Sequence, residues 1–396
     1  MRTAVVVGAG MAGLAAAGAL SRSGWRVTVL ERAERVAGPP TAVVLWPNGL
    51  RALEALDPDG GWSAIASPLP DGGVRRPDGQ WLVTPRARAG AGPAPAAAHL
   101  EDVYDALVAG LGEHVEIRTG FDAAVVTTGP RQRPAVSDGR TTIEADLLVG
   151  ADGIDSRVRA ALAPESVALG SGFAAWQAVI PGFRVPRLSD DRCPGGETLG
   201  AGYRFVAIPL GERAAGKGGV YWVATAAGAT RPEPPATQLA LLRRWFAGWP
   251  EPVGELLAAT RPEELVPQGV RELRPLPRAY GFESGPGGVV LLGDAAHAMP
   301  HHLGQGACLA FEDAATLRSL MATAEPGPDL RAAVQAYSRL RRPRTTSVVR
   351  QNRRMSAVVQ ARGRLALRAR DAALNHMRPR MLGRSLNPVS DWTPPE

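Results

Sequence analysis

A glycine-rich turn near the N-terminus constrains the fold more than any other feature of this sequence. The mostly apolar residues 3–7 precede Gly8-Ala9-Gly10-Met11-Ala12-Gly13, and a helical pattern then continues to Arg22. A second strand pattern follows at residues 26–30 and is succeeded directly by Glu31. This order of strand, Gly-x-Gly-x-x-Gly turn, helix and strand predicts a dinucleotide-binding fold.

Each glycine has a separate physical reason in such a turn. Gly8 permits the tight turn after the strand, Gly10 lets the backbone approach a pyrophosphate, and Gly13 lets the helix pack closely on the sheet. The phosphates would bind at the helix N-terminus, where unpaired N–H groups and the helix dipole favour an anion. Glu31 is placed to accept hydrogen bonds from both hydroxyls of an adenosine ribose. The sequence therefore predicts a nucleotide with a free 2′-hydroxyl, as in FAD or NAD.

Two other interpretations compete for this segment. Residues 4–20 are apolar or glycine after a single arginine, which also fits a secretory signal peptide with an alanine-rich cleavage region. A signal peptide requires neither glycines at this spacing nor a following strand that ends in glutamate. The other alternative is a glycine-rich helix that binds nothing, and the motifs further along the chain argue against it.

Composition excludes several other classes of protein. Hydrophobic residues make up 45% and charged residues 21% of the chain, and no apolar run is long enough to span a membrane. The net charge of +7 comes from arginines interleaved with acidic and apolar residues rather than with stacking aromatics, and Lys217 is the only lysine. We therefore expect no nucleic-acid partner and no membrane span. Cys193 and Cys308 form no Cys-x-x-Cys pair, so we expect no metal site, no disulfide framework and a cytoplasmic location.

A second motif begins where another apolar strand pattern ends. Residues 146–150 lead into Ala151-Asp152-Gly153, and Ser156 is placed to open the next helix. A buried strand that delivers a carboxylate to its C-terminal edge places that group where ligands bind in open α/β sheets. An Asp-Gly turn followed by a helix N-cap explains the same residues without a ligand, and both interpretations stay open.

The third motif is the most specific of the three. Residues 288–292 predict a buried strand that ends in Gly293-Asp294-Ala295-Ala296-His297. Gly304-Gln305-Gly306 then opens a helix. A second glycine turn at a helix N-terminus, beside a strand-end aspartate, predicts a second site for polar groups of one extended ligand.

The middle of the chain has a different pattern. Strand-like runs with aromatic side chains occupy residues 173–275, and a β layer laid across a dinucleotide fold would create a pocket at the interface. Such aromatics are also typical of a core. The remaining patterns predict helices at 50–56, 101–111 and 235–258, a mobile connection at 87–98, and strands at 43–46, 73–76, 80–84, 114–118, 121–127, 141–149, 174–180, 202–210 and 219–226.

The combined motifs resemble the FAD-dependent aromatic hydroxylases, which are single-component flavin monooxygenases. Leu45-Trp46-Pro47-Asn48-Gly49 and Gly304-Gln305-Gly306 are similar to the branch that contains FAD-dependent urate hydroxylase, zeaxanthin epoxidase and salicylate hydroxylase-like enzymes. The resemblance covers essentially the whole chain. It implies an α/β fold with a Rossmann-like FAD-binding domain, an inserted β-sheet substrate domain and C-terminal helices. The implied boundaries are 1–75, 98–165 and 276–330 for the FAD-binding domain, 76–97 and 166–275 for the substrate domain, and 331–396 for the helical region.

The resemblance also implies a reaction, the NAD(P)H-dependent hydroxylation or epoxidation of an electron-rich aromatic or polyene small molecule through a flavin C4a-hydroperoxide. The expected cofactors are noncovalent FAD, NADPH or NADH as electron donor, and molecular oxygen. An oxidase, dehydrogenase or oxidative cyclase without oxygen insertion is the alternative enzyme, and a non-catalytic flavin-binding partner protein is the alternative outside enzymes. The residues implied to contact the cofactor are Gly8, Gly10, Met11, Ala12, Gly13, Glu31, Arg32, Val44, Ala123, Asp152, Gly293, Asp294, Gly304, Gln305, Gly306 and Ala307.

The resemblance places the substrate between the flavin and the middle strands. His301 and His302 are the candidate catalytic residues, as a base or a hydrogen-bond partner of the substrate, because imidazole exchanges protons near neutral pH. Arg204 lies where the urate hydroxylase branch has a substrate-binding arginine, which suits an anionic or carbonyl-bearing substrate. The residues expected to line the pocket are Trp46, Trp176, Arg204, Phe205 and Tyr221.

Two positions depart from the family pattern. Where the family has His-Arg before a helix, this chain has His99 and Leu100, so an arginine that contacts the cofactor is replaced. The proline after the third motif is one position early, at Pro300, and His301 takes its usual place. We therefore expect weaker FAD binding, or another arginine in that role, and a differently tuned flavin face.

Overall fold

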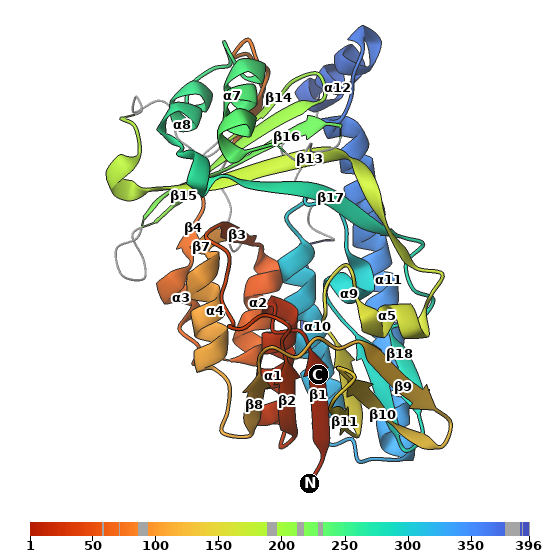
Figure 1. The fold of residues 1–396 in the computed structure, drawn as a ribbon. Coiled ribbons are helices and arrows are strands. Elements are labelled where there is room, and N and C mark those ends of the chain that lie inside the picture. The colour runs from red at the N-terminus through yellow and green to blue at the C-terminus, as the bar shows by residue number, and fades with distance from the viewer. Residues whose placement is uncertain are drawn as a thin grey trace.

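The computed structural model describes residues 1–57, 59–70, 72–85, 94–187, 196–211, 218–228, 233–376, 389 and 391–395. A mostly parallel sheet with helices forms one end of the molecule, and a larger, mainly antiparallel sheet forms the other (Figure 1). This confirms the predicted fold class. Within the described ranges, no helix combines the length and the apolar character that a membrane crossing requires.

The first sheet carries the three motifs. Its strand order is β18-β19-β12-β1-β2-β8, and every neighbouring pair is parallel except β18 with β19. Val7 pairs with Gly150, and Gly150 pairs with Leu291, so the central strands end level with one another. The strands are β1 (Thr3–Val7), β2 (Arg26–Leu30), β8 (Val115–Arg118), β12 (Leu147–Gly150), β18 (Gly281–Ser284) and β19 (Gly287–Leu291).

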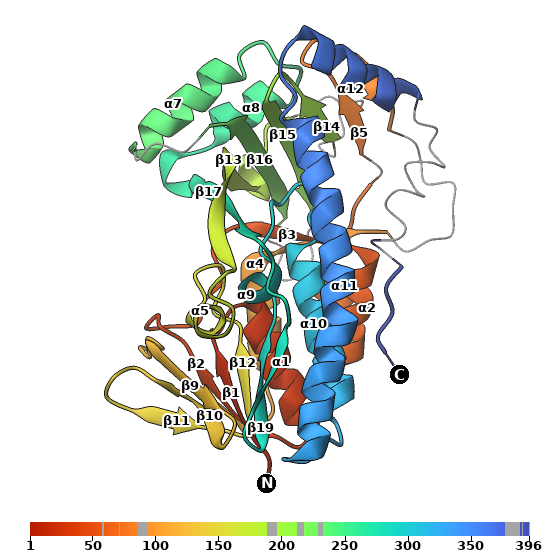
Figure 2. The same ribbon diagram turned by 90° about the vertical axis from the view of Figure 1, so that its right-hand side faces the viewer.

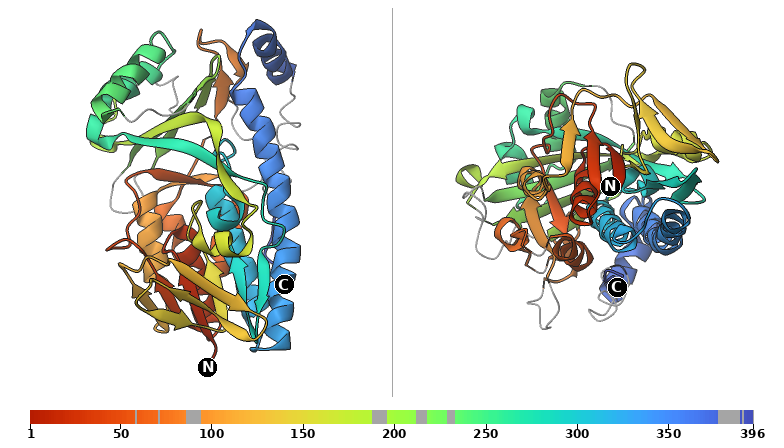
Figure 3. Two further views of the ribbon diagram at one scale, coloured as in Figure 1. Left: turned by 45° about the vertical axis from the view of Figure 1, so that its right-hand side comes forward. Right: turned by 90° about the horizontal axis from the view of Figure 1, so that it is seen from below.

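Small side chains allow close helix packing beside this sheet. Helix α1 (Met11–Arg22) is largely alanine and glycine, is almost entirely buried, and contacts α10 (Gly306–Met321), which also contacts α2 (Pro47–Leu56). The 32-residue helix α11 (Pro328–Val359) packs on α10 and the edge strands and continues to the second sheet (Figure 2). The smaller sheet of β9 (Val125–Gly129), β10 (Gln132–Ser137) and β11 (Thr142–Glu144) lies on the other side from α10 and α11 (Figure 3).

The second sheet has two different faces. Its order is β17-β13-β16-β15-β14-β5-β6. One face packs on α7 (Pro235–Trp245) and α8 (Val253–Ala259) around a separate apolar core. Side chains on the other face contact the parts of the chain that carry the motifs. The strands are β5 (Gly73–Arg75), β6 (Trp81–Val83), β13 (Val167–Pro181), β14 (Gly196–Leu199), β15 (Tyr203–Leu210), β16 (Gly219–Ala227) and β17 (Val266–Arg274).

Short elements complete the chain between these layers. A three-stranded sheet, β3-β7-β4, lies close to β15 of the second sheet. Helix α12 lies against β6. The bounds are β3 (Ala42–Leu45), β4 (Ser67–Pro68), β7 (Ala96–His99), α3 (Trp62–Ile65), α4 (Leu100–Ala109), α5 (Arg157–Leu162), α9 (Asp294–His297), α12 (Arg364–His376), and the 3-10 turns Gly182–Arg184 and Pro262–Glu264.

Several local predictions were wrong. The predicted connection at 87–98 lies partly outside the described residues, but its end is strand β7, which pairs with β3 and β4. The predicted helix 235–258 is interrupted at residues 246–252, which contain a glycine and two prolines that end α7. The predicted strand 121–127 starts later, as β9, and the predicted strand 141–149 is two strands, β11 and β12, which belong to different sheets. Strands β4, β10, β14, β17 and β18 were not predicted. The domain boundaries stay a prediction, and strand β5 at residues 73–75 belongs to the second sheet.

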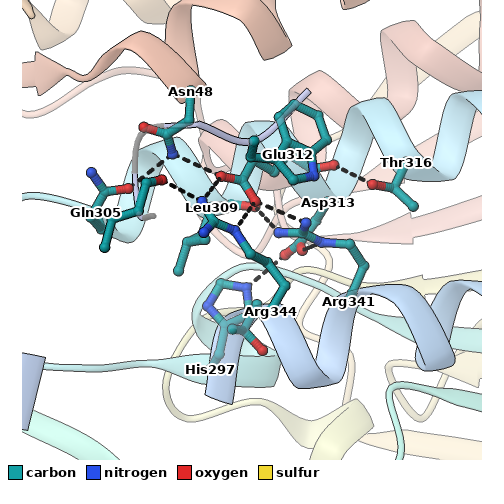
Figure 4. Close-up of polar contacts among 12 residues, drawn as sticks. Asn48, His297, Gln305, Leu309, Glu312, Asp313, Thr316, Arg341 and Arg344 are labelled. Carbon is teal, nitrogen blue, oxygen red and sulfur yellow. Dashed lines mark hydrogen bonds and ion pairs between the residues drawn. The ribbon is translucent and has the colours of Figure 1, made fainter. Parts of the chain in front are cut away.

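A buried charge network joins α10 to α11 (Figure 4). Glu312 and Asp313 are fully buried in α10. The Arg341 guanidinium lies 2.8 Å from Glu312 and 2.6 Å from Asp313, and Arg344 lies 2.8 Å from Glu312. His297 Nε2 lies 2.6 Å from the second oxygen of Asp313. Burial alone would raise the pKa of Asp313, but His297 and Arg341 outweigh it and hold the pKa below its usual value.

We expect Arg341→Met to lower the free energy of unfolding by about 3–5 kcal/mol, because it leaves two carboxylates buried without their main counter-charge. Arg339→Met on the exposed side of the same helix is the matched control and should change stability little. Urea denaturation measures both variants. Equal stability of the two variants would show that the network contributes nothing.

Stability should also depend on acidity through this network. Since the folded-state pKa of Asp313 lies below its unfolded value, the stabilisation is complete above about pH 4 and is lost as the pH falls further. Denaturation midpoints measured between pH 7 and pH 3 should therefore fall less steeply in Arg341→Met than in the wild type. Parallel pH profiles for the two proteins would contradict the assignment.

Candidate active site

The three motif turns meet at one edge of the first sheet. The backbone N–H of Ala151 donates to Val7 O at 2.9 Å, and that of Leu292 donates to Gly150 O at 3.0 Å, so the turns leave adjacent parallel strands. The carboxyl edge of such a sheet is where open α/β folds bind ligands. Residues separated by almost 300 positions in the sequence therefore contribute to one site.

The glycines of the first turn have different surroundings. Gly8 has a φ of +100°, and a Cβ there would lie 2.4 Å from Ala151 O. A Cβ on Gly13 would lie 1.9 Å from Gly8 O. Both glycines are thus required by the fold itself. A Cβ on Gly10 would meet only the Tyr104 hydroxyl, at 3.9 Å, so at this position the protein leaves open space in front of the helix N-terminus.

Glu31 lies at the end of β2, as predicted. Its Oε2 accepts a hydrogen bond from the Ala9 N–H at 2.8 Å, and its Oε1 accepts one from the Ala33 N–H at 2.9 Å. A carboxylate offers about four acceptor positions, so the side chain retains capacity for further donors. The side chain is only partly exposed, and the two backbone bonds fix its orientation beside the glycine turn.

Asp152 combines the two interpretations that its motif left open. Its Oδ2 accepts hydrogen bonds from the N–H groups of Arg157 at 2.7 Å and Val158 at 3.2 Å, and Ser156 caps the same helix. Its Oδ1 is buried and has no hydrogen-bond partner within the described part of the chain. Burial raises the pKa of Asp152. One oxygen therefore serves the helix, while the other has acceptor capacity for a ligand.

The third motif combines a solvent-accessible aspartate with a fixed loop. Asp294 is exposed, yet desolvation by the surrounding protein raises its pKa. Gln305 Oε1 accepts a hydrogen bond from Asn48 Nδ2 at 2.9 Å, and the same amide donates to Glu312 at 2.7 Å (Figure 4). The Gly-Gln-Gly loop is thereby attached to the charge network. Apart from its chain neighbours and its own helix, no atom of the described residues lies within 4 Å of a Cβ built on Gly306.

Arg204 and His302 come together on the inner face of the second sheet. The Arg204 guanidinium makes a bidentate pair with Glu197, at 2.8 and 2.9 Å. Its third nitrogen lies 3.3 Å from His302 Nδ1. Phe173 stacks on the His302 ring at a centroid distance of 4.5 Å. Arg204 therefore already has a counter-charge, and it is not the free cation that the sequence suggested for an anionic substrate.

His302 is buried and His301 is half-buried, and the surroundings of both rings favour the neutral imidazole. Burial, followed by the nearby Arg204, lowers the pKa of His301 to about 4, and burial, Arg204 and His301 together lower the pKa of His302 to about 2. The Nε2 atoms of both rings are buried and have no partner among the described residues. The same holds for the indole Nε1 of Trp46, which lies 3.0 Å from a Cβ built on Gly304.

The predicted aromatic lining divides between the two faces of the second sheet. Tyr221 donates to Gln177 at 2.6 Å and belongs to the inner face with Arg204. Trp176 and Phe205 belong to the opposite core, where Trp176 donates to Gln238 and Phe205 packs on Phe246. Because side chains alternate along a strand, Phe205 must face away from its neighbour Arg204. The structure therefore places Trp176 and Phe205 on the face of the sheet opposite to Arg204 and His302.

The remaining predicted cofactor residues lie in several different elements. Met11 and Ala12 begin α1, Ala307 lies in the first turn of α10, and Arg32 is exposed directly after Glu31. Val44 lies in β3, and Ala123 is buried after β8.

The structure also adds residues that the sequence motifs did not indicate. Tyr104 lies one helical turn after Leu100, beside Gly10 and the Met11 N–H. Its pKa is raised by burial and then by Glu31. Glu197 and Phe173 were also missed. The one sequence feature that could have indicated Tyr104 is its position four residues after Leu100, which places both side chains on the same face of α4.

This arrangement fits FAD. The open space at Gly10 and the N-terminus of α1 suit a pyrophosphate, Glu31 suits an adenosine ribose, and the unpartnered Asp152 oxygen suits a donor of the same ligand. The loop at Gly304 to Gly306 presents a second helix N-terminus with open space. These features agree with the nucleotide that the first motif predicts.

We expect Glu31→Arg to raise the dissociation constant for FAD by about two orders of magnitude, since two charge-assisted hydrogen bonds to the ribose are together worth about 3 kcal/mol. Glu34→Arg makes the same charge change at an exposed neighbour and is the control. Fluorescence titration of the apoprotein with FAD measures both. Identical titration curves would mean that Glu31 does not contact the ribose.

Comparison with known proteins gives the family. The family described as FAD binding domain matches residues 1–352. Aurachin C monooxygenase/isomerase from Stigmatella aurantiaca is 31% identical over 95% of this chain and 94% of its own length. The 2-heptyl-3-hydroxy-4(1H)-quinolone synthase of Pseudomonas aeruginosa is 34% identical over 80% of each chain. The FAD-dependent urate hydroxylase of Klebsiella pneumoniae is 29% identical over 87% of each chain.

A solved structure agrees with the fold. Klebsiella pneumoniae HpxO in complex with FAD and uric acid superposes with a TM-score of 0.82, at 24% identity, over 98% of this chain and 97% of that one. The resemblance drawn from the motifs is therefore confirmed. The chain belongs to the FAD binding domain family, and it is an FAD-dependent monooxygenase.

Proposed function

We propose that this enzyme uses NADPH or NADH and molecular oxygen to hydroxylate or epoxidise an electron-rich aromatic or polyene small molecule, in secondary metabolism or aromatic catabolism. One observation carries the proposal. Buried donors from Trp46 and His302 lie without partners between the cofactor edge of the first sheet and the inner face of the second. The names of the relatives, which include a quinolone synthase, a urate hydroxylase and a 3-amino-4-hydroxybenzoate monooxygenase, support an aromatic substrate.

FAD, when bound, would accept a hydride from the nicotinamide donor and activate oxygen. Glu31, Asp152 and Asp294 hold polar parts of the cofactor along the sheet edge. The network of Asn48 and Glu312 holds Gln305, so that the loop keeps a fixed position. Apolar and aromatic side chains on the inner face of the second sheet, such as Phe173 and Tyr221, would exclude water from the reacting atoms.

The histidines act in this proposal as hydrogen-bonding groups that orient the substrate. A general base is most effective when its pKa lies near the working pH. Burial holds the pKa values of His301 and His302 at about 4 and about 2, far below that range. We therefore do not propose that either ring acts as a base with an ionisation between pH 6 and pH 7.

The sequence has few cysteines and no disulfide framework, which supports the predicted cytoplasmic location.

We expect the purified protein to be yellow and to release its FAD on acid precipitation, because no side chain in the site requires a covalent link. Cys308, in the first turn of α10, is fully buried against Gly49 of α2, and burial raises its pKa to about 12. Absorbance of the supernatant at the flavin maximum measures the release. Flavin retained in the pellet would contradict noncovalent binding.

We further expect NADPH or NADH to reduce the bound flavin without oxygen, and one oxygen atom from ¹⁸O₂ to enter each product molecule. The functions of the neighbouring genes can indicate which aromatic compounds to test as substrates in this assay. Mass spectrometry of the product, with the oxygen consumed measured in parallel, gives the stoichiometry. An oxidised product that contains no ¹⁸O would favour a dehydrogenase or oxidative cyclase instead.

A further inference from the structure

The contact between Arg204 and His302 determines where the imidazole carries its proton. Arginine has five N–H donors and no acceptor, and it remains charged in proteins. Its nitrogen lies 3.3 Å from His302 Nδ1, so Nδ1 is the acceptor of this hydrogen bond. A neutral imidazole with an accepting Nδ1 carries its proton on Nε2.

The charged and titratable groups around His302 keep it neutral. Arg204 would repel an imidazolium, and the second imidazole, His301, lies at a ring distance of 5.6 Å. Glu197 neutralises Arg204 through two hydrogen bonds rather than through contact with the histidine. The group of Glu197, Arg204 and His302 therefore has no net charge, and it presents one additional donor, the Nε2–H.

The position of the Nε2–H donor is fixed, and no group in the described chain accepts a hydrogen bond from it. Phe173 stacks on the ring with an interplanar angle of 26° and so restricts the orientation of the imidazole plane. His302 is 5% exposed, and its Nε2 is buried without a partner. Buried donors in native proteins are normally satisfied, which indicates that a ligand supplies the acceptor.

A second group in the same loop region has the same property. The Trp46 indole can only donate, is buried without a partner, and lies against Gly304. Two unsatisfied donors, beside an Arg204 that is already paired with Glu197, suit a ligand with uncharged oxygen acceptors. These two donors do not suit a carboxylate. A buried anion requires a counter-charge, and the nearby cation, Arg204, already neutralises Glu197.

We propose that His302 is a specificity-determining donor, which selects an uncharged aromatic substrate by hydrogen bonding from Nε2–H to a ring carbonyl oxygen. This inference rests on the proposed function and names its substrate class. Glu197 and Arg204 act as positioning residues, because they fix the tautomer of His302. Of the two substrate classes that the sequence suggested, we therefore retain the carbonyl-bearing substrate and not the anionic substrate.

The first test measures the tautomer without any ligand. Nitrogen-15 NMR of histidine-labelled holoenzyme should show a neutral ring with its proton on Nε2, assigned to His302 by the loss of that signal in His302→Phe. The signal should not titrate between pH 8 and pH 5. A proton on Nδ1, or an ionisation within this range, overturns the proposal.

The second test measures selectivity by isothermal titration calorimetry of the oxidised holoenzyme, with no nicotinamide donor present. The probes are 4(1H)-quinolone, quinoline, which lacks the carbonyl, and quinoline-4-carboxylate. Wild type should bind the quinolone about tenfold more tightly than quinoline, as expected for one hydrogen bond to a buried acceptor, and should bind the carboxylate most weakly.

Variants of His302 distinguish a hydrogen-bond donor from a ring that only fills space. His302→Phe keeps a ring to stack on Phe173 but should lose the tenfold preference for the quinolone. His302→Gln keeps a donor near the Nε2 position and should retain most of that preference. The exposed His114→Phe is the control and should bind all three probes as the wild type does.

Three results would overturn the proposal. In the first, the wild type fails to bind the quinolone, and in the second it binds quinolone and quinoline equally. The third result is a His302→Phe variant that keeps the wild-type preference for the quinolone. Since these measurements involve no turnover, their failure leaves oxygen insertion intact. Conversely, a failed ¹⁸O experiment would leave the binding result standing.

Discussion

The buried ion pairs between α10 and α11 are the interaction on which the rest of the site depends. Glu312 and Asp313 occupy a fully buried position that tolerates carboxylates only while Arg341 and Arg344 remain beside them. The same carboxylates bind the strand end and the loop of the third motif. Asp313 accepts from the Gly293 N–H at 2.9 Å, and Glu312 reaches Gln305 through Asn48.

This dependence connects the C-terminal helix to the cofactor edge. Helix α11 contributes no motif residue to the site, yet its arginines hold α10, the helix that begins at the Gly-Gln-Gly loop. The helix also reaches the second sheet, whose inner face covers the edge. The two halves of the active site are therefore held in relation to one another by one long helix and its buried charges.

The sequence predicted the parts of this arrangement that depend on local pattern. The strands β1, β2, β12 and β19 and the glycine turns follow from hydrophobic periods and from backbone conformations that favour glycine. Their meeting at one edge follows from parallel topology. The alternation of strand side chains was also present in the sequence and would have excluded Phe205 from the pocket, since Arg204 precedes it.

Long-range pairs could not be predicted in this way. Glu197 and Arg204 lie on neighbouring strands, β14 and β15, of which β14 had no clear pattern, and His302 joins them from a loop almost 100 residues later. The partner of Asp313 is equally remote, because Arg341 stands among many arginines with no local feature to distinguish it. Only the folded chain shows which arginine is buried. The cofactor and substrate roles of the individual site residues stay predictions.

A crystal structure of the enzyme with FAD would show directly where the cofactor lies. We expect electron density for the pyrophosphate at Gly10 and the N-terminus of α1, and for the adenosine ribose on Glu31. The flavin ring should lie along residues 304–307, between that loop and the inner face of the second sheet. A pyrophosphate bound away from the first glycine turn, or a flavin ring remote from His302, would contradict this placement.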